Sequence, residues 1–100
     1  MDRVTGIALF IRVVETGSFS KAAGETGITQ PTATKAVAAI EQRLGARLLH
    51  RSTRGVTLTE VGALYYEKCK LIAREIEEAD NLATLQQGGV GGNLRISTSV

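Results

Sequence analysis

The chain has 100 residues, of which 43% are apolar and 22% are charged, and its formal net charge is +2. This length allows one compact domain with an extension but not two separate cores, and the composition excludes a disordered chain. No apolar run is long enough to cross a bilayer or to form a secretory signal, so we expect a cytoplasmic protein without a membrane partner. One cysteine and one histidine exclude an intrachain disulfide and a zinc site, and no cofactor is expected.

The first predicted element is a helix over residues 3–15. Its apolar residues recur at steps of three and four, which places them on one face: Val4, Ile7, Phe10, Ile11 and Val14. Gly17 can end this helix in the left-handed conformation that disfavours other residues. Ser18 is then a suitable N-cap for a second, short helix.

The second and third helices are separated by a short connection that contains Gly27. The second helix has a narrow apolar stripe of Phe19, Ala22 and Ala23. Thr29 is a suitable N-cap for the third helix, and Pro31 falls in its first turn, where a missing N–H breaks no helical hydrogen bond. The buried face of the third helix is predicted to contain Ala33, Val37, Ile40 and Leu44, and Gly45 is predicted to end it.

A small β-hairpin is predicted next. Two short apolar or β-favouring runs, residues 48–49 and 56–58, flank the segment Arg51-Ser52-Thr53-Arg54-Gly55. The tip of this hairpin is therefore basic. His50 is interpreted as a surface residue at its start.

Residues 59–87 are predicted to form one long helix, capped by Thr59 and rich in strong helix formers. At about 1.5 Å per residue it would span roughly 40 Å, more than a small three-helix domain needs, so we expect it to protrude. Apolar residues recur along it in two heptad series, and these form the predicted dimer interface: Tyr65, Cys69, Ile72, Ile76, Ala79 and Ala83.

Two interpretations of this stripe compete. It could pack back on its own domain, which we expect for its first two turns, and which gives Cys69 a packing role in preference to a redox role. Beyond Leu71 too little chain remains to cover the stripe, so self-association is favoured there.

The glycine-rich segment at residues 88–93 is predicted to be a flexible hinge. It lacks the strand, the helix and the lysine that a phosphate-binding loop requires. Residues 94–100 begin an alternating strand with no later sequence to pair with, which indicates the start of a truncated further domain. The predicted organisation is therefore a domain of three helices and a hairpin at 1–58, a linker helix at 59–87, the hinge, and the strand.

Two helices joined by a tight turn, at about residues 19–38, have the plan of a helix-turn-helix, and the hairpin would be its wing. Polar side chains near the start of the third helix lie away from its apolar face: Gln30, Thr32, Thr34 and Lys35. Gln30 can contact an adenine edge, and Lys35 can reach guanine or phosphate. Arg51 and Arg54 would lie along the DNA backbone or enter a narrow minor groove.

The charge distribution supports this assignment without proving it. Residues 27–58 contain five basic residues and one acid, a net charge of +4, whereas residues 59–87 contain three basic residues and six acids, a net charge of −3. An ordinary solvated helix face would explain the polar residues equally well in isolation. The ordered conjunction of caps, short helix and basic hairpin favours DNA binding.

Two other classes of function are weighed. A winged-helix protein adaptor would use the same core, but acidic or apolar residues are absent at Lys35, Arg51 and Arg54. An enzyme is set aside, because no carboxylate pair, nucleophile–base set or metal cluster can be assembled from these residues.

The chain closely resembles the N-terminal domain and linker helix of LysR-type transcriptional regulators, over nearly all of its length. The residues that carry the likeness form an ordered and specific set: FIRVVETGSFSKAA at 10–23, TQPTATKAVAAIEQRL at 29–44, GARLLHR at 45–51, TLTEVGALYY at 57–66 and the turn into a second domain at 94–97. The resemblance implies a mainly α fold, a winged helix-turn-helix of three helices and a two-stranded wing, followed by a long dimerisation helix.

The resemblance also implies partners and contacts. Linker helices of such proteins pair antiparallel in a homodimer, often a dimer of dimers, on an interrupted dyad-symmetric site in double-stranded promoter DNA. The family's DNA contacts fall on the positions of Gln30, Pro31, Thr32, Thr34, Lys35, Arg51 and Arg54. Complete members carry a two-lobed domain that binds a small effector, which this chain lacks, and act in the bacterial cytoplasm on the nucleoid.

This sequence departs from the family pattern at three positions of the third helix. Members more often carry serine and arginine where this chain has Thr34 and Lys35. Lysine keeps the charge but lacks the planar fork that binds guanine bidentately, so it keeps a phosphate contact better than a base contact. Ala33 is smaller than the usual valine or leucine.

Overall fold

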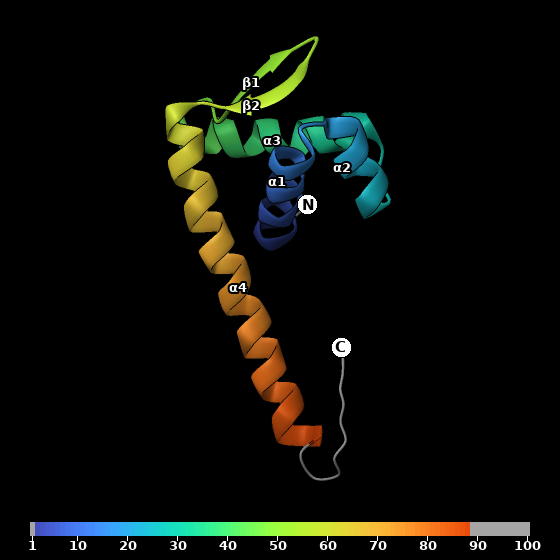
Figure 1. Ribbon diagram of the computed structural model, residues 1–100, viewed down its shortest axis with the longest axis vertical. Helices are drawn as coiled ribbons and strands as arrows, with labels where there is room; N and C mark the ends of the chain where they lie inside the picture. The colour runs from blue at the N-terminus through green and yellow to red at the C-terminus, as the bar shows by residue number, and fades with distance from the viewer. Residues whose placement is uncertain (1, 89–100) are drawn as a thin grey trace. The chain divides into compact units, whose positions relative to one another are not determined.

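The computed structural model describes residues 2–88 of the chain (Figure 1). Its elements in order are α1 (Arg3–Thr16), α2 (Phe19–Thr26), α3 (Gln30–Leu44), β1 (Leu49–Ser52), β2 (Gly55–Leu58) and α4 (Glu60–Gly88). The two strands pair antiparallel, with Leu49 opposite Leu58 and Ser52 opposite Gly55. This confirms the predicted fold class. The chain divides into two compact units within α4, the first ending at Lys70 and the second beginning at Leu71.

The predicted caps form the helix boundaries. The Ser18 hydroxyl accepts a hydrogen bond from the Lys21 amide at 3.1 Å, and the Thr29 hydroxyl accepts one from the Thr32 amide at 3.3 Å. Gly27 has φ +74°, a conformation that residues with a Cβ rarely adopt, and this permits the tight turn between α2 and α3. Asp2, which the sequence did not single out, caps α1 by accepting from the Thr5 amide at 2.7 Å.

The face that α1 buries differs from the predicted one. Leu9, Phe10 and Val13 are 0% exposed, whereas Val4 is 52% exposed and lies outside the core. The other residues of the predicted stripe, apart from Phe10, are half-buried at the rim of the core: Ile7, Ile11 and Val14. The apolar arc of α1 is wider than one stripe, so its neighbours and not its periodicity decide which residues lie at the centre.

The face of α3 follows the prediction until its last turn. Ala33 and Val37 are fully buried, and Ile40 is 4% exposed beside Gly6 of α1. Leu44 was expected in this face but is 43% exposed, because it lies at the helix end next to the Gly45 cap, where the core no longer covers it.

The hairpin is fixed to the helices at its base. The carboxylate of Glu41 on α3 accepts hydrogen bonds from the amides of Leu48 at 2.8 Å and Leu49 at 3.3 Å. The Val56 amide donates to the Gly17 carbonyl at 3.2 Å. Since Leu48 and Leu49 are also buried, the position of the wing is set by both core packing and these hydrogen bonds.

Helix α4 begins in close contact with the wing base. The Thr59 hydroxyl accepts from the Gly62 amide at 2.8 Å and donates to the Arg47 carbonyl at 2.7 Å. A Cβ on Gly62 would lie 1.9 Å from the Leu48 carbonyl oxygen. Only glycine fits there, and this close approach fixes where α4 leaves the domain.

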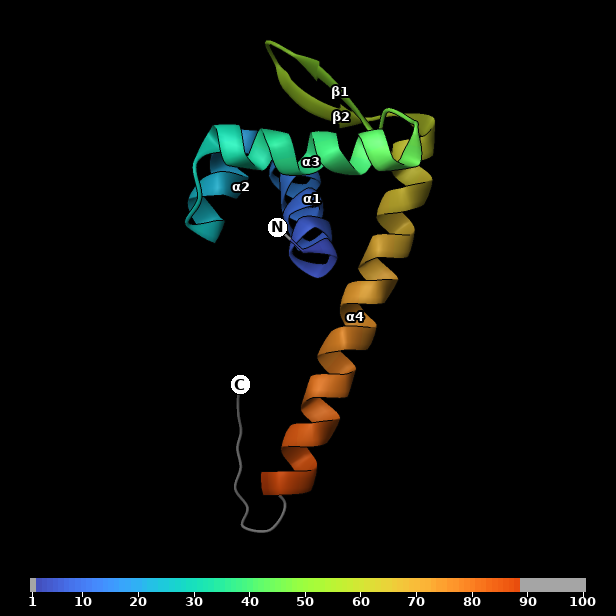
Figure 2. The same cartoon turned by 180° about the vertical axis from the view of Figure 1, so that it is seen from behind.

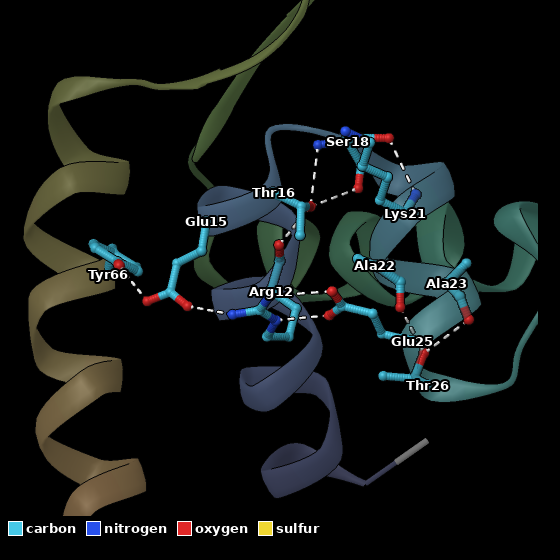
Figure 3. A network of polar contacts seen from close by, with 10 residues as sticks. All are labelled: Arg12, Glu15, Thr16, Ser18, Lys21, Ala22, Ala23, Glu25, Thr26 and Tyr66. Atoms are coloured by element: carbon cyan, nitrogen blue, oxygen red, sulfur yellow. Dashed lines mark hydrogen bonds and ion pairs between the residues drawn. The ribbon is translucent and has the colours of Figure 1, made fainter.

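The first turns of α4 pack on α1, as the sequence predicted. The Tyr65 ring meets the Phe10 ring edge-on, with centroids 5.6 Å apart, and Cys69 is 1% exposed. A polar chain lies beside this contact (Figure 3). Tyr66 donates to Glu15 at 2.8 Å, and Arg12 binds both Glu15 at 2.6 Å and Glu25 of α2 at 2.7 Å.

The apolar residues of α4 after Lys70 are exposed. Their exposed fractions lie between 37% and 64%, for Leu71, Ile72, Ile76, Leu82 and Leu85. The helix includes Gly88, where the hinge was predicted to begin, and the remaining hinge residues and the strand at 94–100 lie outside the described residues. Among residues 2–88, no helix combines the length and apolar content needed to cross a bilayer.

Candidate nucleic-acid interface

The exposed arc of α3 carries five of the predicted contact residues. Since successive helical residues are separated by about 100°, Gln30 and Thr34 lie at one edge of this arc. Thr32 lies at the other edge, and Pro31 and Lys35 lie between them. All five are exposed except Thr34, which is half-buried. The buried face opposite contains Ala33 and Val37, so packing on α1 and α2 orients the polar arc outward.

One groove, here called the wing groove, brings together predicted residues that are distant in sequence. It has a volume of about 540 Å³, and its lining residues come from the start of α2, the start of α3 and the hairpin. These three elements can be followed in Figure 2. Its lining residues are Thr16, Gly17, Ser18, Phe19, Ser20, Lys21, Gln30, Thr34, Arg51, Ser52, Thr53, Arg54, Gly55 and Val56. Three of these are cations and none is a carboxylate.

A second groove, here called the α1–α3 groove, contains the other two polar residues of the arc. Thr32 and Lys35 lie beside the first turn of α1 and do not line the wing groove. The lining residues are Asp2, Arg3, Gly6, Thr32, Lys35, Ala36, Ala39, Ile40 and Arg43. The predicted contact set is thus divided between two flanks of one helix.

Local contacts hold several of these side chains. The Arg51 guanidinium lies 4.5 Å from the centre of the Phe19 ring, a cation–π contact that joins the wing to α2. The Thr32 hydroxyl lies 2.8 Å from the Thr29 hydroxyl. The Arg54 amide donates to the Ser52 hydroxyl at 3.2 Å, which shapes the hairpin tip. Arg51 is therefore preordered, whereas the Arg54 side chain is exposed at the tip.

Sequence reasoning missed Ser20 and Lys21, which are exposed on the wing groove beside Arg51. Both lie in the first turn of α2, and only the position of the wing relative to α2 reveals their place. Their signal in the sequence was a pair of adjacent polar residues in the first turn of a short helix, two and three positions after its N-cap Ser18.

The predicted dimer residues fall into two groups. Cys69 is buried within the first unit, where burial raises the pKa of its thiol, and Tyr65 is half-buried against Phe10. The other four are at least partly open to solvent: Ile72 is 44% exposed, Ile76 is 37% exposed, and Ala79 and Ala83 are exposed. Within residues 2–88, no cluster of three or more His, Cys, Asp or Glu could hold a metal ion, and His50 is exposed.

A polar helix face beside a basic hairpin, both supported by a three-helix core, defines a winged helix-turn-helix domain. The chain matches the profile of bacterial regulatory helix-turn-helix proteins of the lysR family over residues 5–63. It therefore belongs to this family. The match confirms the prediction of a LysR-type, DNA-binding transcription regulator, a class distinct from enzymes.

Relatives and solved structures agree with this assignment. The chain is 49% identical over 89 residues to an HTH-type transcriptional regulator of Xanthomonas campestris, covering 89% of this chain and 26% of that relative. It is similar to the CbnR DBD solved in a DNA complex, with 31% identity and a TM-score of 0.76, over 83% of this chain and 94% of that one. For the BenM DBD in complex with catB site 1 DNA the identity is 26% and the TM-score 0.82, over 94% and 100% of the two chains.

Proposed function

We propose that this chain binds double-stranded promoter DNA by placing the exposed arc of α3 in the major groove and the wing along the backbone beside it. The observation that carries the proposal is the wing groove, which joins Gln30 and Thr34 to Arg51 and Arg54 with no carboxylate among its lining residues. Similar domains are solved on DNA, which supports the same partner here.

Each contact residue has a role that follows from its chemistry. The Gln30 amide can donate to and accept from an adenine edge, and Thr34 beside it can offer a methyl to thymine or a hydroxyl to phosphate. Pro31 and Thr32 lie at the helix start, where the backbone amide dipoles favour an approaching phosphate. Lys35 is a point charge without the planar fork of arginine, so we assign it to phosphate before guanine.

The wing contributes affinity with little sequence information. Arg54 lies exposed at the hairpin tip, and Arg51 is held over Phe19 next to the groove. A preordered guanidinium loses less side-chain entropy on binding a phosphate. We therefore assign both arginines to the backbone or to a narrow minor groove.

We also propose that the protein binds its site as a homodimer. The apolar face of α4 after Lys70 is exposed over Ile72, Ile76, Ala79 and Ala83, at heptad spacing. A second copy of this helix would cover it, and two DNA-binding domains would then meet a dyad-symmetric site. Tyr65 and Cys69, which already pack in their own domain, are assigned at most to the edge of this interface.

We propose that a small molecule controls the protein through the two-lobed domain that the family resemblance implies for complete members. The chain spans about a quarter of the Xanthomonas relative, 26% of its length. Action on bacterial promoters in the cytoplasm, and assembly as a dimer of dimers, belong to the same proposal.

Fluorescence anisotropy tests the proposed surface. The probes are a labelled duplex from upstream of the protein's own gene and a random duplex of equal length. Lys35→Gln or Arg54→Gln should weaken binding to both probes by about 1–3 kcal/mol and flatten the log–log salt slope by about one unit. Gln30→Ala should chiefly reduce the preference for the specific duplex.

The matched control is Lys68→Gln, which removes one positive charge at an exposed position of α4 that lines neither groove. It should leave the salt slope unchanged. Unaltered DNA affinity in both Lys35→Gln and Arg54→Gln would reject the surface and favour a protein-binding role for the domain.

A further inference from the structure

The α1–α3 groove contains two basic residues that the proposed contacts do not use. Arg3 comes from the first turn of α1, and Arg43 from the last turn of α3, with Lys35 between them. The residues around them are small or apolar: Gly6, Ala36, Ala39 and Ile40.

The positive charge of this groove is not neutralised by ion pairs. Within residues 2–88, Arg12, Arg47 and Lys70 form ion pairs, whereas none of Arg3, Lys35 and Arg43 does. One carboxylate, that of Asp2, lines the groove. It caps α1 by accepting a hydrogen bond from the Thr5 amide. Three cations and one acid leave a net positive surface.

The groove lies on the opposite flank of α3 from the wing. Figure 2 shows α3 in front of α1, with the hairpin above it and the N-terminal end of α1 below it. The side-chain directions agree, because Gln30 and Thr34 line the wing groove whereas Thr32 and Arg43 line the other.

A helix in the major groove lies between two phosphate backbones, about 12 Å apart. The wing can meet only one of them. Thr32 and Arg43 are separated by roughly 16 Å along α3, at about 1.5 Å per residue, which is enough to pass several phosphates of one strand. The second flank of α3 therefore has the length, the charge and the position to meet the other backbone.

We propose that Arg3 and Arg43 bind phosphates of the DNA backbone across the major groove from the wing, so that α3 is held by cations on both of its flanks. This rests on the proposed function, since it requires α3 to occupy the groove. It assigns contacts to α1 and to the C-terminal end of α3, outside the predicted helix-turn-helix surface.

The test measures DNA affinity against salt concentration for Arg3→Gln, Arg43→Gln and the double variant, on the same two duplexes. Each single substitution should flatten the log–log salt slope by about 0.9 unit, and at 0.1 M salt this corresponds to an affinity about eightfold lower. In the double variant, the change in the log–log salt slope should be about twice that of either single variant. Specific and random duplexes should be affected alike, because phosphates carry no sequence information directly.

Ethylation interference locates the contacts. Arg3→Gln and Arg43→Gln should abolish interference at phosphates on the strand across the major groove from the wing and keep it on the wing side. Arg54→Gln should show the reverse pattern. Arg3→Lys and Arg43→Lys keep the charge and should restore the salt slope, which separates a charge contact from a loss of folding.

The outcomes distinguish this second backbone contact from the DNA-binding surface proposed above. If Lys35→Gln and Arg54→Gln flatten the slope and the Arg3 and Arg43 variants do not, the second backbone contact is rejected and the main surface stands. If none of the four changes the slope, the DNA-binding surface itself is rejected. The proposal is also overturned if the glutamine variants flatten the salt slope and the lysine variants do not restore it.

Discussion

The two parts of helix α4 carry the same kind of apolar repeat but use it differently. Up to Lys70 the repeat is covered by the chain itself, with Cys69 1% exposed and Tyr65 against Phe10. After Lys70 the repeat continues through Ile72 and Ile76, and these side chains are 44% and 37% exposed. One heptad pattern therefore gives a core in one part and an uncovered face in the other.

A periodic apolar pattern specifies one property of a helix and leaves another open. Periodicity determines which side chains share a face of a helix. It does not determine which surface covers that face, because the cover comes from residues distant in sequence or from another chain. The first unit contains its own cover, whereas the second has apolar area that a partner helix would bury.

The largest expected effect is dissociation by Ile76→Glu. A charge in the proposed seam would be buried without a partner, which typically costs several kcal/mol, so the dimer should become a monomer at micromolar concentration. Light scattering or sedimentation measures the mass. Asn81→Glu adds the same charge on another side of α4 and should leave the dimer intact. A dimeric Ile76→Glu would remove the distinction between the two parts of the helix.

Gly62→Ala tests the first unit. Its Cβ would lie 1.9 Å from the Leu48 carbonyl oxygen, so the backbone must shift, and the free energy of unfolding should fall by about 3 kcal/mol. Urea denaturation followed by circular dichroism measures it. The control is Gly24→Ala in α2, where no atom lies within 4 Å of the new Cβ, and where alanine should stabilise by about 0.5–1 kcal/mol. Equal stability of the two variants would contradict the close approach.

Glu41 tests the attachment of the wing. Glu41→Ala leaves the amide of the buried Leu48 without its acceptor and should cost about 2 kcal/mol. Glu41→Gln keeps one acceptor oxygen and should cost about half as much. Thermal unfolding gives the order of stability, and Glu67→Gln, exposed on α4, is the control for loss of one negative charge. A Glu41→Ala variant as stable as the control would show that core packing alone holds the hairpin.

The smallest effect is a pH dependence from the polar chain in Figure 3. Arg12 hydrogen-bonds the Glu25 carboxylate and lowers its pKa below the ordinary value of 4.5. The folded state therefore binds this proton less readily than the unfolded state, so stability is present above the ordinary pKa and lost as pH falls through the folded one. Arg12→Gln should reduce the fall in melting temperature between pH 7 and pH 2.5, because the Glu25 carboxylate then loses its partner at every pH. An unchanged fall in melting temperature would contradict the interaction between Arg12 and Glu25.

The order of elements was predictable because the signals are local. Ser18 and Thr29 cap helices with their own side chains, and Gly27 provides the turn through its own φ angle. The exposed arc of α3, from Gln30 to Lys35, followed in the same way from periodicity. Each of these features depends on residues within five positions of one another.

The composition of the core and of the grooves was less predictable. Leu9 and Val13 are buried in place of Val4, because neighbouring helices select the centre of a wide apolar arc. Lys21 joins the wing groove, and Arg3 joins Lys35 and Arg43, only through the crossing of distant elements. Glu41 is the one acid in the basic segment at residues 27–58, and only the fold shows that its carboxylate accepts hydrogen bonds from the amides of Leu48 and Leu49.

The elements, most of their caps, the family and the polar face of α3 follow from the amino-acid sequence alone, since hydrogen bonds along the chain and helical periodicity act over short separations. The tertiary structure decided how that face is divided between two basic grooves. It also decided where the repeat of α4 changes from core to exposed surface, near Lys70. These two outcomes depend on contacts between residues far apart in the chain. The geometry of these contacts follows from side-chain packing and from close backbone approaches, such as that of Gly62 to Leu48.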